Sequence, residues 1–257
     1  MNILVIGDVV GNQGCQFLRE KLPAFKRLKN IQFVIANGEN STDGNGITPS
    51  SAEHLFSSGV DVITTGNHAF RRREVYDYFD SEPYLLRPAN LPNGTTPGKG
   101  YCIVDKGRVQ ICVANIMGTV YMESLECPFA TADRILKETP EAKIHIFDIH
   151  AEATGEKRAL GFYLDGRASA VFGTHTHVLT SDAGVLPGGT GYVTDTGMTG
   201  PVQSVLGVKP ELAIAKMKNK LPVRFEYAQG ECMLNATLFE INDATGKTVS
   251  AQSFDLR

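Results

Sequence analysis

The chain has 257 residues, of which 42% are hydrophobic and 21% are charged, as is usual for a soluble globular protein. Its formal net charge of −3 argues against a duplex nucleic-acid partner, and no run of about 20 apolar residues predicts a membrane span. Five scattered cysteines without a CxxC pair argue against a thiolate zinc site and a secreted disulfide framework. We expect one cytoplasmic domain over residues 1–257 with no membrane partner, and a homo-oligomeric state stays open.

Strand and helix signals alternate over roughly the first third of the chain. Thr48 and Pro49 form a helix start, because Thr is a favoured N-cap residue and Pro fits the first helical position. The apolar spacing predicts strands at Asn2–Ile6, Gln32–Ala36 and Val60–Thr65, and helices at Gln13–Leu28, from Pro49 to about Gly59, and at Arg72–Phe79. This order predicts parallel strands joined by right-handed crossovers.

The pattern changes after Tyr84. We expect strands at Tyr101–Val104, Val109–Ile116, Ile144–Ile149, Ala168–Phe172 and Tyr192–Thr194, and helices at Cys127–Glu138, Glu156–Leu164 and Pro210–Lys218. The tail alternates in period two at Val223, Phe225 and Tyr227, then over Met233–Ile241 and Val249–Phe254. This alternation predicts a second, largely antiparallel sheet. The fold class that we predict is α/β, with two packed mixed β-sheets flanked by helices.

Polar side chains that can bind metal ions follow five of the strand-like runs. These runs are Ile3–Ile6, Phe33–Ala36, Val60–Thr65, Ile144–Phe147 and Ala170–Phe172. Ligands of open α/β sheets bind at the carboxyl ends of the strands, so residues far apart in sequence can converge there. The candidate metal ligands are Asp8, Glu39, Asn40, Asn67, His150, His175 and His177.

This set of candidate ligands mixes imidazole with oxygen donors, which suits iron, manganese or zinc. Seven donors are too many for one tetrahedral ion but suit two ions that share a bridging carboxylate. Two such ions can clamp the attacking and leaving oxygens of a phosphoryl transfer.

The motifs Gly66-Asn67-His68 and Gly173-Thr174-His175-Thr176-His177, with Asp8, Glu39-Asn40 and His150, resemble the ordered series of the calcineurin-like metallophosphoesterases. Gly7–Gly11, Asn37–Asn40 and Asp195–Pro201 are similar to the bacterial YmdB-like branch, and the resemblance runs from residue 3 to about residue 207. It implies an αββα sandwich. It also implies that Asp8, Glu39, Asn40 and His177 hold one metal, that bridging Glu39, Asn67, His150 and His175 hold the other, and that His68 is the catalytic acid.

Three positions depart from the wider superfamily. Val10 stands where many members have a metal-binding His, and Glu39 stands where most have a bridging Asp. Ala69 follows His68 in place of an acidic or small polar residue. The first two substitutions fit the YmdB-like branch and leave each ion with enough ligands.

The resemblance implies a dinuclear metal-dependent phosphodiesterase, in which a metal-bound hydroxide attacks phosphorus and His68 protonates the leaving alkoxide. The implied substrates are small phosphodiesters, with cyclic nucleotides of the 2′,3′-cyclic AMP and GMP class foremost. Iron is the metal expected first, with manganese and zinc as alternatives. Two other functions stay open: a metal-stabilised regulatory or binding protein with incidental hydrolysis, and a metal-dependent amidohydrolase, which the lack of an HxH near the first strand disfavours.

Several charged residues near the motifs have two interpretations. The run Arg71–Arg73 is either a solvated face or a phosphate contact made by Arg71 or Arg72. Asp148, Glu152 and Asp195 are candidates for the carboxylate that accepts the second N–H of a metal-bound histidine.

Overall fold

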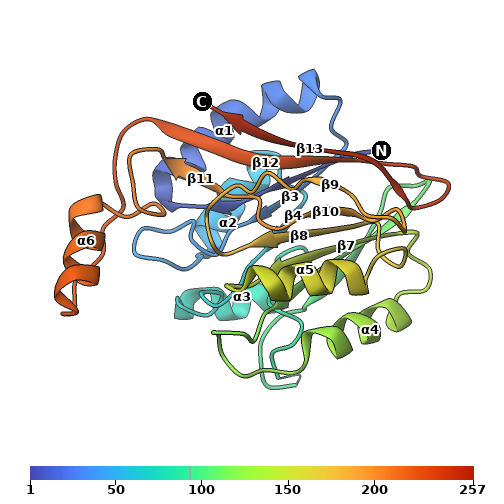
Figure 1. The fold of residues 1–257 in the computed structure, drawn as a ribbon, viewed down its shortest axis with the longest axis horizontal. Helices are drawn as coiled ribbons and strands as arrows, with labels where there is room; N and C mark the ends of the chain where they lie inside the picture. The colour runs from blue at the N-terminus through green and yellow to red at the C-terminus, as the bar shows by residue number, and fades with distance from the viewer. Residues whose placement is uncertain (93) are drawn as a thin grey trace.

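In the computed structural model, which describes residues 1–92 and 94–257, two β-sheets lie face to face between helices (Figure 1). The first sheet contains β1 (Asn2–Ile6), β2 (Asp8–Val9), β3 (Phe33–Asn37), β4 (Val62–Thr64), β11 (Met198–Pro201), β12 (Cys232–Ile241) and β13 (Thr248–Leu256). Its strand order is β2-β11-β12-β1-β3-β4, and β13 pairs with β12. Strands β1, β3 and β4 are parallel, as their alternation with helices predicts.

The second sheet contains β5 (Tyr101–Asp105), β6 (Gln110–Met117), β7 (Ile144–His150), β8 (Ala170–Thr174), β9 (Gly184–Val185) and β10 (Gly191–Val193). Strands β6, β7, β8 and β10 are parallel to one another, whereas the edge strands β5 and β9 run antiparallel to their neighbours. The expectation of a second, largely antiparallel sheet is therefore wrong. The C-terminal strands instead pair with β1 of the first sheet, because alternation in period two indicates a half-covered strand but does not select its partner.

The helices are α1 (Gly11–Leu28), α2 (Pro49–Ser57), η1 (Arg73–Val75), α3 (Tyr76–Ser81), α4 (Pro128–Glu138), α5 (Thr154–Tyr163) and α6 (Pro210–Asn219). Thr48 caps α2 through a reciprocal pair of hydrogen bonds with Ser51, and Pro49 occupies the first turn as predicted. The segment expected as one helix at Arg72–Phe79 is a 3₁₀ turn followed by α3. Of the alternating positions Val223, Phe225 and Tyr227, only Tyr227 forms a bridge, to Val208, so this segment is not a sheet strand.

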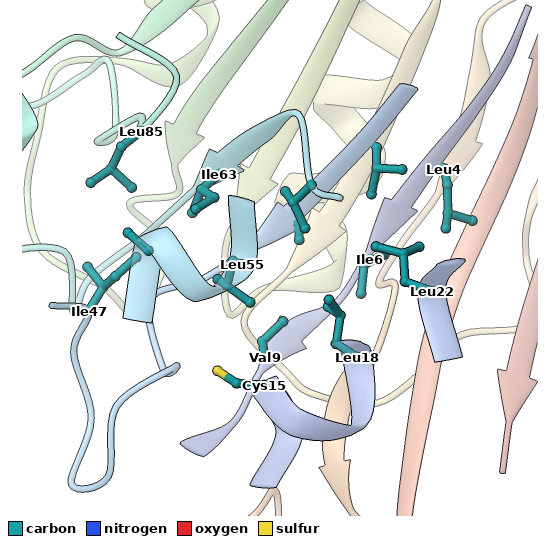
Figure 2. Close-up of a cluster of buried hydrophobic side chains, with 14 of the residues drawn as sticks. Leu4, Ile6, Val9, Cys15, Leu18, Leu22, Ile47, Leu55, Ile63 and Leu85 are labelled. Atoms are coloured by element: carbon teal, nitrogen blue, oxygen red, sulfur yellow. The ribbon is translucent and has the colours of Figure 1, made fainter. Parts of the chain in front are cut away.

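Alternate residues of β1 face different layers. Leu4 and Ile6 pack with Leu18 and Leu22 of α1, and Figure 2 shows these side chains together in one cluster. Ile3 and Val5 instead belong to the apolar layer between the two sheets. A third cluster lies between the second sheet and α4 and α5. The fold is therefore the predicted αββα sandwich, in which the sheets are buried on both faces.

Helix α6 lies away from the two-sheet body (Figure 1). Ala213 is its buried residue, whereas Ile214 and Met217 are 58% and 63% exposed. Across residues 1–92 and 94–257, no helix combines the length and apolar character that crossing a bilayer requires.

Candidate metal centre

The carboxyl ends of five strands position the candidate site. Asp8 follows β1, the Glu39-Asn40 pair follows β3, and the Asn67-His68 turn follows β4. From the second sheet, His150 is the last residue of β7, while His175 and His177 come directly after β8. Because the two sheets lie face to face, these strand ends come together. All eight sequence-predicted site residues contact at least one other member of the set, as described below.

One group of donors consists of Glu39, Asn67, His150 and His175. Glu39 Oε1 lies 3.2 Å from His150 Nε2, and Asn67 Oδ1 lies 2.9 Å from the same nitrogen. His175 Nδ1 is 3.1 Å from His150 Nε2. The ligand atoms of Glu39, His150 and His175 all lie within 4.8 Å of one another. Four donors therefore surround one small volume.

A second group consists of Asp8, Asn40 and His177. His177 Nε2 lies 3.4 Å from Asp8 Oδ1 and 3.3 Å from Asn40 Nδ2. Asn40 Nδ2 also donates to Asp8 Oδ1 at 3.4 Å. As the side chain stands, Asn40 therefore turns its NH₂ toward this group, and a rotation of its amide would present Oδ1 instead.

The two groups are tied together through backbone N–H groups. His175, from the first group, donates its backbone N–H to Asp8 Oδ2 at 3.0 Å. Glu39 Oε2 accepts the backbone N–H of His68 at 2.9 Å. Each buried carboxylate thus also fixes a loop that carries another site residue.

His68 lies at the rim of the centre, with 30% of its side chain exposed. Its Nδ1 is 3.0 Å from Asn40 Oδ1 and 3.3 Å from Glu39 Oε1, both of which are acceptors. Nδ1 therefore carries a hydrogen and donates it. The other ring nitrogen, Nε2, has no hydrogen-bond partner among the described residues and stays accessible to a substrate.

Hydrogen bonds behind the centre set the histidine tautomers. The hydroxyl of Thr174 donates to Asp148 Oδ1 at 2.7 Å, so it accepts from His150 Nδ1, which lies at 2.9 Å. His177 Nδ1 in turn donates to the carbonyl of Leu206 at 3.1 Å. Both histidines therefore direct Nε2 into the centre, and Nε2 is the atom that binds a metal ion once its proton has left.

Burial by itself raises the pKa of a carboxyl group and lowers that of a histidine. His150 and His68 nevertheless hold the pKa of Glu39 well below its ordinary value, and His177 lowers the pKa of Asp8. In return, Glu39 raises the pKa of His150 to about 9 against the effect of burial, and Asp8 raises the pKa of His177. The centre therefore holds two ionised carboxylates in a buried place that favours positive charge.

The backbone around the centre has unusual geometry. His175 and His177 adopt φ values of 97° and 62°, in the region that side chains other than glycine rarely occupy. Gly66 packs so closely on His150 that a Cβ there would lie 2.1 Å from the imidazole Cδ2. Strained residues cluster at functional sites, where the surrounding contacts keep them in place.

A buried ion pair that no sequence pattern indicates stabilises the loop that carries His175 and His177. Lys157 of α5 donates to Asp195 Oδ2 and to the carbonyl of Thr174, each at 2.7 Å. Asp195 also accepts the backbone N–H and the hydroxyl of Thr176. Asp195 therefore fixes the loop and contacts no histidine ring.

The other charged residues singled out from the sequence have different partners. Asp148 reaches His150 through the Thr174 hydroxyl, whereas Glu152 lies 3.1 Å from His175 Nε2. Arg72 donates to the carbonyl oxygens of Asn45 and Asp43, so its guanidinium holds the preceding loop.

The donor set fits metal ions. Imidazole nitrogens, carboxylate oxygens and an amide oxygen converge in the buried centre, and such mixed sets suit iron, manganese and zinc. The two buried carboxylates of Asp8 and Glu39, whose pKa values are lowered, attract cations to this place.

Replacing Glu39 by Ala is expected to lower metal content at both groups together. Glu39 is the carboxylate that contacts His150 directly and also fixes His68, so its loss removes a shared donor. Purified wild-type protein should hold about two transition-metal ions per chain. Elemental analysis of both proteins measures the effect, with Glu138→Ala as a control that removes a partly exposed carboxylate of α4 outside the two donor groups. Full metal content in the Glu39 variant would contradict a bridging role.

Comparison with known proteins places the chain in a family. The YmdB-like protein family matches residues 4–254. A 2′,3′-cyclic-nucleotide 2′-phosphodiesterase of Bacillus subtilis is 46% identical over 253 residues, which cover 98% of this chain and 96% of that protein. The crystal structure of a hypothetical protein from Thermus thermophilus matches with a TM-score of 0.93 and 41% identity over 100% of both chains.

A crystal structure described as a novel phosphatase, from Mycoplasma pneumoniae, matches with a TM-score of 0.94 and 31% identity. The match covers 100% of this chain and 93% of that one. Sequence and fold thus agree over nearly the whole length. The chain belongs to the YmdB-like protein family.

Proposed function

We propose that the chain is a phosphodiesterase with a dinuclear metal centre that hydrolyses 2′,3′-cyclic nucleotides. The observation that carries the proposal is the convergence of two donor groups beside His68, whose Nδ1 contacts Asn40 and Glu39 and whose side chain is partly exposed. The names of the B. subtilis and M. pneumoniae relatives, a phosphodiesterase and a phosphatase, support hydrolysis of phosphate esters. We further propose that residues 1–257 form one domain, since β1 and β12 pair across almost the whole sequence.

We assign the ligands by group. Asp8, Asn40 and His177 would hold one ion with Glu39, and Asn67, His150 and His175 would hold the other with the same Glu39. Binding through Asn40 requires its amide to turn Oδ1 toward Asp8 and His177, which takes Oδ1 away from His68 Nδ1 and leaves Glu39 as its acceptor. When bound, two transition-metal ions, with iron foremost and manganese or zinc as alternatives, supply positive charge for the phosphate oxygens and activate water at neutral pH.

The chain's own residues then serve the leaving group. In the overall reaction, a water oxygen joins phosphorus, the bond from phosphorus to the 2′-oxygen breaks, and that oxygen takes up a proton. The Glu39 carboxylate accepts from Nδ1 and so fixes the ring of His68, which leaves Nε2 as the atom that holds the proton and donates it. The partly exposed place of His68 lets the ring reach a bound ester and regain a proton from solvent.

We expect a higher kcat/KM for diesters than for matching monoesters. Two divalent ions balanced by Asp8, Glu39 and one hydroxide leave about one positive charge, which matches a diester monoanion better than a monoester dianion. Metal-loaded protein should therefore prefer bis-p-nitrophenyl phosphate over p-nitrophenyl phosphate, and 2′,3′-cyclic AMP over 3′-AMP, in competition assays. A preference for the monoesters would refute the assignment as a diesterase, but the broader assignment as a metallophosphoesterase would stand.

The same assay separates the alternative functions. A regulatory protein with incidental hydrolysis would bind 2′,3′-cyclic AMP but turn over every ester slowly, with or without added metal. An amidohydrolase would cleave anilides such as p-nitroacetanilide and leave the phosphodiesters intact. Removal of metal by a chelator should abolish diester turnover, and restored metal should return it.

A further inference from the structure

A cationic pocket lies beside the metal centre. It measures about 550 Å³, a size typical of sites for small ligands. Its lining contains three guanidinium groups, those of Arg71, Arg72 and Arg224, but only one carboxylate, that of Asp43. This local excess of positive charge stands out in a chain whose formal net charge is −3.

The pocket is connected to the centre through short stretches of chain. Arg71 comes three residues after His68, and its backbone N–H donates to the His68 carbonyl at 3.0 Å. On the opposite wall, Tyr227 packs against Gly11, whose backbone N–H donates to the Asn40 carbonyl at 2.8 Å. A substrate held at the metal centre can therefore extend into this pocket.

Two of the three guanidinium groups are available for a ligand. Arg72 is already engaged with the carbonyls of Asp43 and Asn45. Arg71 and Arg224 are exposed, and neither makes a hydrogen bond or an ion pair within the described part of the chain. Guanidinium groups bind phosphate oxygens in a fork geometry, so this pair is suited to a phosphate.

The pocket also offers an aromatic surface. Phe225 is 45% exposed and lines the pocket between Arg224 and Tyr227. The Tyr227 hydroxyl donates to Asn45 Oδ1 at 2.6 Å, which fixes this wall to the opposite loop. Cationic side chains beside an exposed ring are the combination by which proteins bind single-stranded nucleic acid, through backbone phosphates and stacked bases.

We propose that this pocket binds the nucleotide on the 5′ side of a terminal 2′,3′-cyclic phosphate, so that the preferred substrates are short oligoribonucleotides. A mononucleotide has one phosphate, which the metal centre would take. Because a 2′,3′-cyclic phosphate ends the chain, a second phosphate can come only from the 5′ side. Arg71 and Arg224 bind that phosphate, and Phe225 stacks on the base beyond it. The inference rests on the proposed function.

Three substrates test the pocket: adenosine 2′,3′-cyclic phosphate, its 5′-phosphorylated form, and the dinucleotide ApA that ends in a 2′,3′-cyclic phosphate. In the wild type, kcat/KM should rise in that order. Arg71→Ala and Arg224→Ala should lower kcat/KM for the two larger substrates by about tenfold or more relative to the first. Phe225→Ala should lower kcat/KM for the dinucleotide but not for the 5′-phosphorylated mononucleotide.

Arg73→Ala is the matched control, because Arg73 belongs to the same run and is exposed but does not line the pocket. It should leave the substrate ratios unchanged. Unchanged ratios in the Arg71 and Arg224 variants, or an equal loss on all three substrates, would overturn the proposal. If the wild type has equal kcat/KM values for the two larger substrates and Phe225→Ala has no effect, the preferred substrate is a 5′-phosphorylated mononucleotide and not an oligonucleotide.

A binding experiment keeps this inference separate from the proposed function. Calorimetric titration with ApA 3′-phosphate measures the pocket without turnover, and the affinity should exceed that for 3′-AMP by about tenfold in the wild type but not in Arg224→Ala. Inactivity toward bis-p-nitrophenyl phosphate would refute the phosphodiesterase assignment alone. Equal affinities for the two ligands in the wild type would refute the pocket alone.

Discussion

Replacing His68 by alanine is expected to lower kcat for 2′,3′-cyclic AMP by roughly 10²–10⁴-fold, the usual contribution of a general acid. In the proposed reaction the imidazole Nε2 donates the proton, and a 2′-alkoxide is a poor leaving group without protonation. Metal content should stay at the wild-type level, because Nδ1 contacts Asn40 and Glu39 from outside the two donor groups. Steady-state kinetics with elemental analysis of the same preparations measures both effects.

The leaving group provides the internal control for His68. A p-nitrophenolate leaves with little protonation, so the loss on bis-p-nitrophenyl phosphate should be much smaller than the loss on the cyclic nucleotide. An equal loss on both substrates would show that His68 holds the site together and does not deliver a proton. Lost metal in the variant would lead to the same conclusion.

Replacing Lys157 by methionine is expected to lower the free energy of unfolding by about 3–5 kcal/mol, because it leaves the Asp195 carboxylate buried without its cation. Both side chains of this pair are 1% exposed. The double variant Lys157→Met with Asp195→Asn should recover part of the loss, since no lone charge then remains. Urea unfolding at neutral pH measures all three proteins.

The exposed pair Lys209–Glu226 is the control for Lys157. Its Nζ and Oε2 are 2.7 Å apart, the same distance as in the buried pair, but its side chains are 37% and 59% exposed. Lys209→Met should therefore change stability far less. Equal effects of the two substitutions would show that burial of the Lys157–Asp195 pair carries no special cost. Because Asp195 fixes Thr176, the Lys157 variant should also bind metal more weakly.

The sequence predicts the convergence of the site because it depends on strand ends. Each of β1, β3, β4, β7 and β8 is an apolar run that stops at a polar motif, and parallel strands bring such ends to one edge. That rule places Asp8 at the edge of the first sheet and His150 at the edge of the second, and the packing of the two sheets then brings them together. The grouping of Glu39 with His150 and of Asp8 with His177 came from family resemblance, and the distances agree with it.

Other features depend on tertiary partners that no local pattern encodes. Lys157 lies between Glu156 and Arg158 in what looks like a solvated helix face, yet it is buried against Asp195. The two-residue strands β2 and β9 are too short for periodicity to reveal. For β12, alternation identified a strand but not its place beside β1.

The pairing of β1 with β12 also constrains when the centre can form. Ile6, the last residue of β1, pairs with Ala236, and Asp8 lies two residues further on. Strand β2, which contains Asp8, pairs in turn with β11. Contacts between residues so distant in sequence form slowly, because a long loop must close before they are made. During synthesis, β1 leaves the ribosome well before its partners, and it gains both neighbouring strands only after Ala36 and Ala236 have emerged. Metal capture through Asp8 is therefore a late step of folding.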